Sequence, residues 1–307
     1  MKGELVRAWT GDGLQLQGLL CSPEGDKGSK AILHIHGSAS NFYRNYFVEY
    51  AADEFVSRGY AFLTGNTRGH DIVNRLYRRE ASGPEGLRAQ RGDSTSRSYI
   101  IGGAREIFDE CLYDIAAWLD LLQARGYTHL VLQGHSFGAV KVTFYQSQTH
   151  DERVKALIIA SPGDVAFWRE QEGSRLEESL KRAKQMIGQG RGNESISLDS
   201  FPYPLSAEYL YTTFGPQAKT NIFAYCDPAH PWAEVKSIRC PILALYGTEN
   251  EPVVRDTAEC LALLKSKAVS SPRCDTVVVQ GAEHNYRGRE NEVAKVIADW
   301  LDEVFRG

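Results

Sequence analysis

The chain has 307 residues, of which 42% are hydrophobic and 24% are charged, and its formal net charge is −4. This composition is ordinary for a globular protein with one large domain, or with a core domain that carries an insertion. The slightly acidic balance gives no reason to expect nucleic acid or an anionic membrane as a partner, and no apolar run reaches the 18 residues of a membrane span.

The cellular compartment is suggested by two further features of the sequence. The first residues, Met1–Val6, have no apolar segment of the kind found in signal peptides. The six cysteines are scattered, with no Cys-x-x-Cys pair, at Cys21, Cys111, Cys226, Cys240, Cys260 and Cys274. Such cysteines are typical of reduced, structural thiols, so a cytoplasmic location is expected.

The N-terminal third alternates between short apolar runs and helical stretches. Leu5–Trp9 and Leu14–Cys21 flank a Gly-Asp-Gly turn and predict a β-hairpin. A buried strand is predicted at Ala31–Ile35, a helix at Tyr43–Arg58 and another strand at Ala61–Thr64. Residues 72–103 are polar and basic without clear periodicity, which fits either a solvated loop or a segment that faces a substrate.

His34 and His36 stand two residues apart around the end of the first buried strand. This spacing raises the question of a metal site, but no carboxylate or cysteine partner is suggested nearby. Packing and hydrogen bonding in the loop are the roles predicted for these two histidines. No metal and no cofactor is expected.

The stretch Leu130–Gly138 reads Leu-Val-Leu-Gln-Gly-His-Ser-Phe-Gly and contains a Gly-x-Ser-x-Gly pattern centred on Ser136. A strand before it and a helical stretch from Ala139 after it are the context of a nucleophile elbow, in which small residues let strand and helix pass closely. An acyl-transfer site also needs two backbone N–H groups for the oxyanion, and Phe137 and Ser38 are in the positions to supply them. The alternative is a glycine-rich turn in which Ser136 only caps the helix.

The region from Val165 to Ile238 interrupts the alternation of strands and helices. After a helix at Glu106–Arg125 and a strand at Val154–Ala160, no buried strand appears until Pro241. A charged helix through Arg169–Ile187 is followed by an aromatic stretch, which fits either a substrate-facing wall or the small core of an inserted unit. The sequence therefore predicts a core of residues 1–164 and 239–307, with a helical cap at 165–238.

The last strands, Ile242–Tyr246 and Thr276–Gln280, bring the predicted sheet to eight strands, most of them parallel and covered by helices on both faces. Ligands of such α/β sheets bind beyond the carboxyl ends of the strands. Ser38, Ser136, Asn250 and His284 all follow strands directly, so all four can meet at that edge.

The order of nucleophile, acid position and histidine is that of the α/β-hydrolase fold, and the chain resembles this superfamily over nearly its whole length. A narrower resemblance, to a poorly characterised group akin to the fungal siderophore esterases, lies in His36-Gly37-Ser38, Asn41-Phe42-Tyr43, Asn66-Thr67-Arg68-Gly69-His70-Asp71, Gly134-His135-Ser136-Phe137-Gly138 and His284-Asn285-Tyr286-Arg287-Gly288. The resemblance implies a serine hydrolase of a small-molecule ester or lactone. Ser136 would be its nucleophile, His284 its base, and Ser38 and Phe137 the oxyanion donors.

The acid position departs from the family pattern. The pattern is Gly-x-x-Asp, and counting from Gly247 places Asn250 where the aspartate is expected. Asn250 is accordingly predicted as the third catalytic residue, an amide that orients the imidazole without a charge. Glu249, Glu251 and Asp164 are alternative partners of His284, and the sequence does not decide among them.

Two other functions are compatible with these residues. The same serine could transfer the acyl group to an acceptor other than water, as an acyltransferase or cyclase does. The unusual acid position also allows a binding protein that kept the fold and lost turnover. An intact Ser136 and His284 favour hydrolysis.

Overall fold

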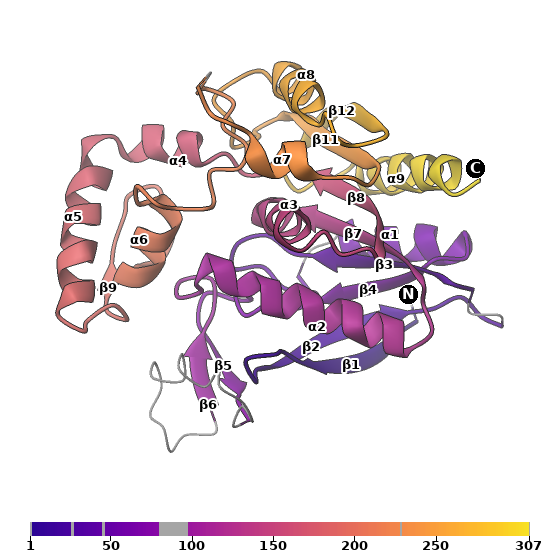
Figure 1. Cartoon of the computed structure of the whole chain (residues 1–307), viewed down its shortest axis with the longest axis horizontal. Coiled ribbons are helices and arrows are strands. Elements are labelled where there is room, and N and C mark those ends of the chain that lie inside the picture. Colours follow the sequence, from indigo (N-terminus) through magenta and orange to yellow (C-terminus); the bar gives the residue numbers. More distant parts are fainter. Residues whose placement is uncertain (1, 26–27, 45–46, 80–97, 228, 307) are drawn as a thin grey trace.

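The computed structural model describes residues 2–25, 28–44, 47–79, 98–227 and 229–306, and an eight-stranded sheet is at its centre (Figure 1). The strands are β1 (Glu4–Trp9), β2 (Gln15–Cys21), β3 (Lys30–Ile35), β4 (Ala61–Gly65), β7 (His129–His135), β8 (Val154–Ala160), β11 (Ile242–Glu249) and β12 (Cys274–Glu283). Their order in the sheet is β1-β2-β4-β3-β7-β8-β11-β12. β2 is antiparallel to both of its neighbours, and all other pairs are parallel. The predicted mostly parallel sheet is confirmed.

Helices cover both faces of the sheet, because successive side chains of a buried strand point to opposite sides. In β7, Val131 packs in the cluster that contains α1 (Phe47–Ser57) and α9 (Glu290–Val304). Its neighbours Leu130 and Leu132 pack in the cluster on the other face. That face is covered by α2 (Cys111–Ala124), α3 (Phe137–Thr149), α7 (Ala233–Ser237) and α8 (Thr257–Lys267).

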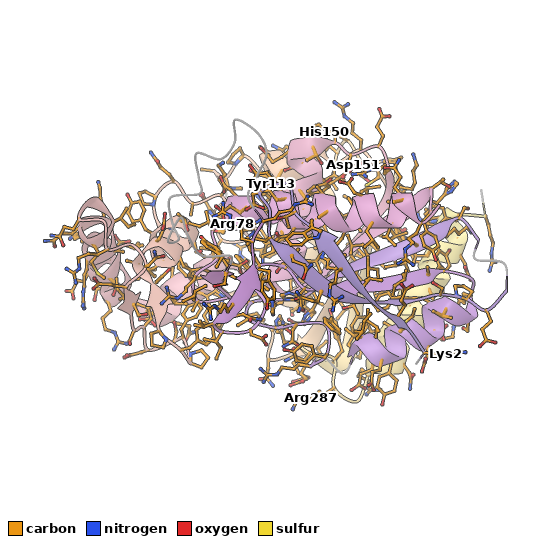
Figure 2. All side chains as sticks on the ribbon, turned by 90° about the horizontal axis from the view of Figure 1, so that it is seen from below. Lys2, Arg78, Tyr113, His150, Asp151 and Arg287 are labelled. Carbon is orange, nitrogen blue, oxygen red and sulfur yellow. The ribbon has the colours of Figure 1, made fainter. Side chains whose placement is uncertain are left out.

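A smaller unit with its own apolar core lies at one end of the molecule. It consists of α4 (Val165–Glu172), α5 (Ser174–Gly188), β9 (Ser195–Ile196), β10 (Leu205–Ser206) and α6 (Ala207–Phe214). Figures 1 and 2 show it from two directions at one end of the long axis, with α9 and Lys2 toward the other end. The helix predicted at 169–187 is two helices, because Gly173 has a φ of 56° and ends α4.

The range predicted as a cap, 165–238, divides between two apolar clusters. Residues up to Phe214 belong to the small unit, whereas Ile222, Tyr225 and Trp232 pack in the main core. The aromatic stretch is divided in the same way. We use the name cap unit for residues 165–214.

The polar segment predicted at 72–103 contains a two-stranded ribbon, β5 (Asn74–Tyr77) paired with β6 (Ser98–Ile101). Leu76 and Ile101 anchor this ribbon in the main core. The rest of the segment, 80–97, lies outside the described residues. Beyond it, a 3₁₀ turn (Phe108–Glu110) leads into α2, later than the predicted start of that helix. Of the helices in the described ranges, none is long and apolar enough to cross a bilayer.

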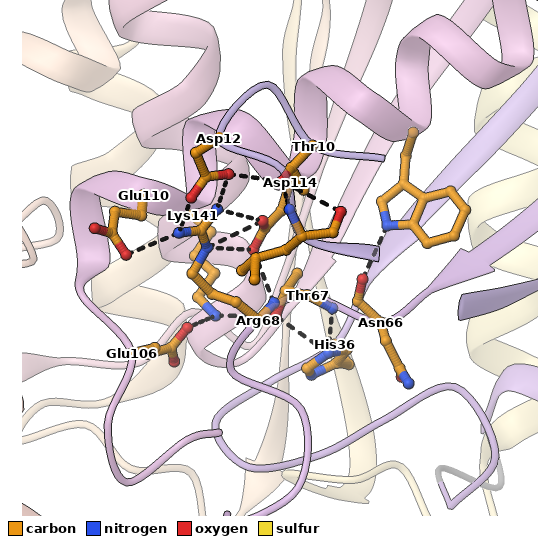
Figure 3. A network of polar contacts seen from close by, with 12 residues as sticks. Thr10, Asp12, His36, Asn66, Thr67, Arg68, Glu106, Glu110, Asp114 and Lys141 are labelled. Carbon is orange, nitrogen blue, oxygen red and sulfur yellow. Dashed lines mark hydrogen bonds and ion pairs between the residues drawn. The ribbon is translucent and has the colours of Figure 1, made fainter. Parts of the chain in front are cut away.

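A buried ion cluster connects the N-terminal hairpin to the helical layer (Figure 3). The guanidinium of Arg68 is only 1% exposed and contacts Asp12 in the hairpin turn at 2.9 Å, Glu110 at 2.8 Å and Asp114 on α2 at 2.9 Å. Burial raises the pKa of the Asp114 carboxyl to about 6, although Arg68 opposes this rise. The cluster joins three chain segments that are distant in sequence.

Candidate active site

The turn between β7 and α3 holds Ser136 in an unusual backbone conformation. Its φ is 56° and its ψ is −125°, a region that residues with a side chain rarely occupy. The Ser136 N–H donates to the Ala160 carbonyl at 2.9 Å, which ties the turn to β8. Strain of this kind is concentrated at functional sites, and here it lifts the hydroxyl out of the strand-to-helix turn.

The glycines around Ser136 are required by the close approach of backbone segments. A Cβ at Gly134 would lie 2.3 Å from the Gly138 carbonyl oxygen, and one at Gly138 would lie 2.2 Å from the Ile35 carbonyl oxygen. A Cβ at Gly37 would lie 2.9 Å from the Ser136 Cβ. These contacts explain why the pattern needs small residues on both sides of the serine.

A serine, a histidine and a glutamate form a continuous line of hydrogen bonds at the carboxyl edge of the sheet. The His284 Nε2 lies 2.9 Å from the Ser136 Oγ, and the His284 Nδ1 lies 2.7 Å from the Glu251 Oε2. A carboxylate only accepts, so Nδ1 carries the proton and Nε2 is free to accept from the serine hydroxyl. This is the tautomer that a general base for a serine nucleophile needs.

The Glu251 carboxylate is fixed by groups other than the histidine. Its Oε1 accepts a hydrogen bond from the Ser161 hydroxyl at 2.6 Å and from the Gly247 N–H at 2.8 Å. Ser161 is in turn 2.7 Å from the buried Tyr286 hydroxyl. With 2% of its side chain exposed, Glu251 presents only Oε2 to the imidazole.

Asn250 was predicted to support His284, but the residue that contacts the His284 Nδ1 in the structure is Glu251, one of the alternative partners. Asn250 follows the end of β11 with a φ of 53°, and this left-handed step turns the next residue, Glu251, back toward the sheet edge. The carboxylate that contacts His284 therefore comes one residue later in the chain than the Gly-x-x-Asp pattern counted from Gly247 predicts. Asn250 instead lines the adjoining pocket.

The other two acid candidates have different contacts. The Glu249 side chain is exposed and accepts a hydrogen bond from the Thr248 hydroxyl. The Asp164 Oδ1 caps α4 by accepting from the Ala166 N–H at 2.8 Å. Its Oδ2 has no hydrogen-bond partner among the described residues. Burial raises the pKa of Asp164 to about 6, against the lowering effect of nearby backbone N–H groups.

The loop after β3 is positioned by His36. The Thr67 N–H donates to the His36 Nε2 at 3.0 Å, so the proton of the neutral ring lies on Nδ1, which donates to the Gly37 carbonyl at 2.8 Å. The Gly37 carbonyl and the Ser38 N–H belong to one trans peptide, in which they point in opposite directions. Holding the carbonyl therefore also fixes the direction of the Ser38 N–H.

The remaining histidines near the site are buried and uncharged. His34 packs between Phe47 and Phe62, and burial lowers its pKa to about 4. Burial also lowers the pKa of His135 to about 3, and its Nε2 is 2.7 Å from the His284 carbonyl oxygen. In the described part of the chain, no group of three or more His, Cys, Asp or Glu residues is arranged to hold a metal ion.

A cavity of about 340 Å³ opens beside Ser136 and His284 and extends under the cap unit. Ser38 and Phe137 also line it. Its walls are mostly apolar and aromatic, with contributions from Val140, Phe167, Trp168, Phe201, Tyr209 and Phe214. A cavity of this size, lined by apolar side chains and a few polar groups, is typical of a site for a small organic molecule.

Comparison with known proteins agrees with this architecture. The family model described as alpha/beta hydrolase fold matches residues 30–207. The chain belongs to this family. A search of curated proteins returned no match for this α/β hydrolase.

Solved structures with the same fold cover nearly the whole hydrolase. DcsB, in complex with its substrate analogue, has a TM-score of 0.66 at 15% identity, with all of both chains covered. Est1E from Butyrivibrio proteoclasticus, with ferulic acid bound, has a TM-score of 0.64 at 17% identity and covers 98% of this chain and 100% of its own. A soluble variant of monoglyceride lipase from Saccharomyces cerevisiae, in complex with a substrate analog, has a TM-score of 0.63 at 15% identity. The match covers 99% of this chain and 96% of the lipase. At these identities the likeness shows the fold.

Proposed function

We propose that this α/β hydrolase cleaves a small carboxylic ester through an acyl-enzyme on Ser136. The observation that carries the proposal is the hydrogen-bond line from Ser136 through His284 to Glu251 beside the apolar cavity. The comparison proteins support esters as the class, since one is described as a carboxyl esterase from Bacillus coagulans and another as a monoglyceride lipase.

In the first half of the reaction, the Ser136 oxygen attacks the ester carbonyl carbon while the His284 Nε2 takes the hydroxyl proton. The resulting imidazolium is stabilised by the Glu251 carboxylate, 2.7 Å from Nδ1. The negative charge on the former carbonyl oxygen is stabilised by the N–H groups of Phe137 and Ser38. His284 then donates its proton to the departing alcohol.

In the second half, water replaces the alcohol. His284 takes a proton from the water, which attacks the acyl carbon, and the carboxylic acid leaves as the Ser136 hydroxyl is restored. The apolar walls of the cavity suit an aliphatic or aromatic acyl group, and the cap unit, residues 165–214, forms most of these walls. A lactone fits the same chemistry, and in that case acid and alcohol leave as one molecule.

The proposal is tested with a fluorophosphonate probe and a series of p-nitrophenyl esters from acetate to octanoate. The wild-type enzyme is expected to be labelled on Ser136 and to hydrolyse these esters. The Ser136→Ala variant should not be labelled, and its kcat should fall by about 10⁶-fold. Labelling without turnover in water, but with turnover when an alcohol or amine acceptor is added, would favour an acyltransferase. Absence of both labelling and turnover in the wild type would contradict the proposal.

A further inference from the structure

A buried ion pair is connected through Thr67 and His36 to the loop that carries Ser38. Lys141, on α3 one turn beyond the elbow, has a side chain with 0% exposure, and its Nζ lies 2.6 Å from the Oε2 of Glu106, which is 1% exposed. Removing both charges from water carries a large desolvation cost, so such a pair is weak evidence for stability on its own. The reaction steps described so far use neither residue.

Three hydrogen bonds link this pair to the oxyanion loop, and Figure 3 shows the Glu106, Lys141, Thr67 and His36 side chains of this path. The Lys141 Nζ donates to the Thr67 Oγ1 at 3.4 Å, and the Thr67 Oγ1 lies 3.2 Å from the His36 Nε2. The Lys141 ammonium can only donate, so the Thr67 oxygen accepts from it, and the Thr67 hydroxyl proton shares the His36 Nε2 as acceptor with the Thr67 N–H. The His36 Nδ1–H then donates to the Gly37 carbonyl at 2.8 Å.

All donors in this series of hydrogen bonds, from Lys141 to the Gly37 carbonyl, point in the same direction. It begins at a cation, passes through the Thr67 hydroxyl and the His36 ring, and ends in the peptide whose N–H belongs to Ser38. Hydrogen bonds in series polarise one another, most strongly in a buried, low-dielectric environment. A positive charge at the start and a developing oxyanion at the end both favour this direction.

Lys141 also contacts the second proposed oxyanion residue. Its Nζ lies 5.2 Å from the centre of the Phe137 ring, within cation–π distance. The Glu106 carboxylate also packs closely against Gly69, where any Cβ would collide with it. The ion pair therefore has a defined position between the two segments that supply the oxyanion N–H groups.

We propose that the Lys141–Glu106 pair is a positioning element for the oxyanion hole, acting on Ser38 through Thr67 and His36 and on Phe137 by direct contact. The proposal rests on the function assigned to Ser136 above. It is supported by the pKa of His36, which burial lowers well below its usual value and the charge of Lys141 lowers further. His36 thus stays neutral, with a single proton on the nitrogen that faces Gly37.

The test compares Lys141→Met and Thr67→Val with wild type in ester hydrolysis and in the binding of phenylboronic acid, which forms a tetrahedral adduct with a catalytic serine. Loss of one oxyanion donor costs about 10²–10³ in kcat, so a misaligned donor is expected to cost at least about tenfold. KM is expected to change by less than about threefold, because the ground-state carbonyl depends little on these donors. Boronate affinity should fall by the same factor as kcat/KM.

Glu110→Gln is the matched control, because it removes a buried charge from the neighbouring Arg68 cluster without interrupting the donor chain. It should lower the melting temperature and leave boronate affinity unchanged. Lys141→Arg, which keeps the charge, should recover part of the lost kcat. If Lys141→Met does not fold, Thr67→Val carries the test by itself, since valine matches the shape of threonine and leaves the backbone N–H in place.

The proposal is overturned if both variants keep kcat and boronate affinity within about threefold of wild type, or if their losses fall on KM. Losses that scale with melting temperature in the same way as those of Glu110→Gln would also overturn it. A wild-type enzyme that neither turns over esters nor reacts with a fluorophosphonate would instead refute the assigned function of Ser136. The two failures are therefore distinguishable.

Discussion

Replacing Glu251 with glutamine tests the acid position with almost no change of shape. The Oε1 site receives two hydrogen bonds, from the Ser161 hydroxyl and the Gly247 N–H, so the amide oxygen of the glutamine is expected to occupy it. The amide NH₂ then faces the His284 Nδ1. Because that group donates, Nδ1 must accept, and the imidazole proton moves to Nε2, where it opposes the Ser136 hydroxyl.

The size of the effect follows from this change of tautomer. The corresponding acid-to-amide change in a serine protease lowers kcat by about 10⁴, which is about 5.5 kcal/mol of transition-state stabilisation. We expect Glu251→Gln to lower kcat by about 10³ to 10⁴. Stability should fall by only about 1.5–3 kcal/mol, the range for a hydrogen bond to a charged group.

The assay is p-nitrophenyl acetate hydrolysis across a pH series, with fluorophosphonate labelling to count intact sites and circular dichroism to check folding. Asn250→Asp is the control, because it adds a carboxylate at the position expected from the sequence while leaving Glu251 in place. It should change kcat by less than about fivefold. A Glu251→Gln enzyme within about tenfold of wild type, or an Asn250→Asp enzyme much faster than wild type, would refute the assignment of Glu251.

Two further predictions concern the cavity. Phe167 lines it but is not part of the buried core of the cap unit, so Phe167→Ala should raise KM or shift preference toward longer acyl chains with little change in melting temperature; a purely thermal effect would contradict a substrate-facing role. Burial raises the pKa of Asp164 from 3.8 to about 6, so the folded state favours the neutral carboxyl. As the pH rises from about 4 to above 6, this carboxyl ionises and the free energy of unfolding decreases. Asp164→Asn keeps the cap of α4, and its stability relative to wild type should increase by up to about 3 kcal/mol between about pH 4 and pH 7 in urea titrations. A difference that does not vary with pH would show that Asp164 ionises normally.

The fold was predictable because its signals are local. Alternating buried strands and amphipathic helices set the sheet, and the strained turn at Ser136 has a short motif that requires glycines at known offsets. His284 was predictable for the same reason, as it directly follows a strand. The order of these elements along the chain was enough to indicate the family.

The acid position was not predictable, because it depends on a backbone angle rather than on residue order. A left-handed φ at Asn250 adds a turn, so that the carboxylate one residue later reaches the imidazole. Asparagine is enriched in that conformation, and this preference was the only local signal for the turn. Hydrogen bonding of His36 within its loop was predicted, whereas the position of Lys141 was not, since it rests on a contact with Thr67, 74 residues away in the chain.

The Arg68 cluster also affects how the protein unfolds locally. Arg68 follows Thr67 directly in the chain, and its guanidinium is shared by the turn of the N-terminal hairpin and by α2. The antiparallel hairpin at the sheet edge is the part of the fold that would otherwise detach first, because β1 pairs with a neighbouring strand on one side only. Detaching it would leave a buried arginine with fewer counter-charges, next to the residue that orients His36. We therefore expect detachment of the hairpin to loosen the segment of Thr67 and Arg68 and, through His36, the loop that carries Ser38.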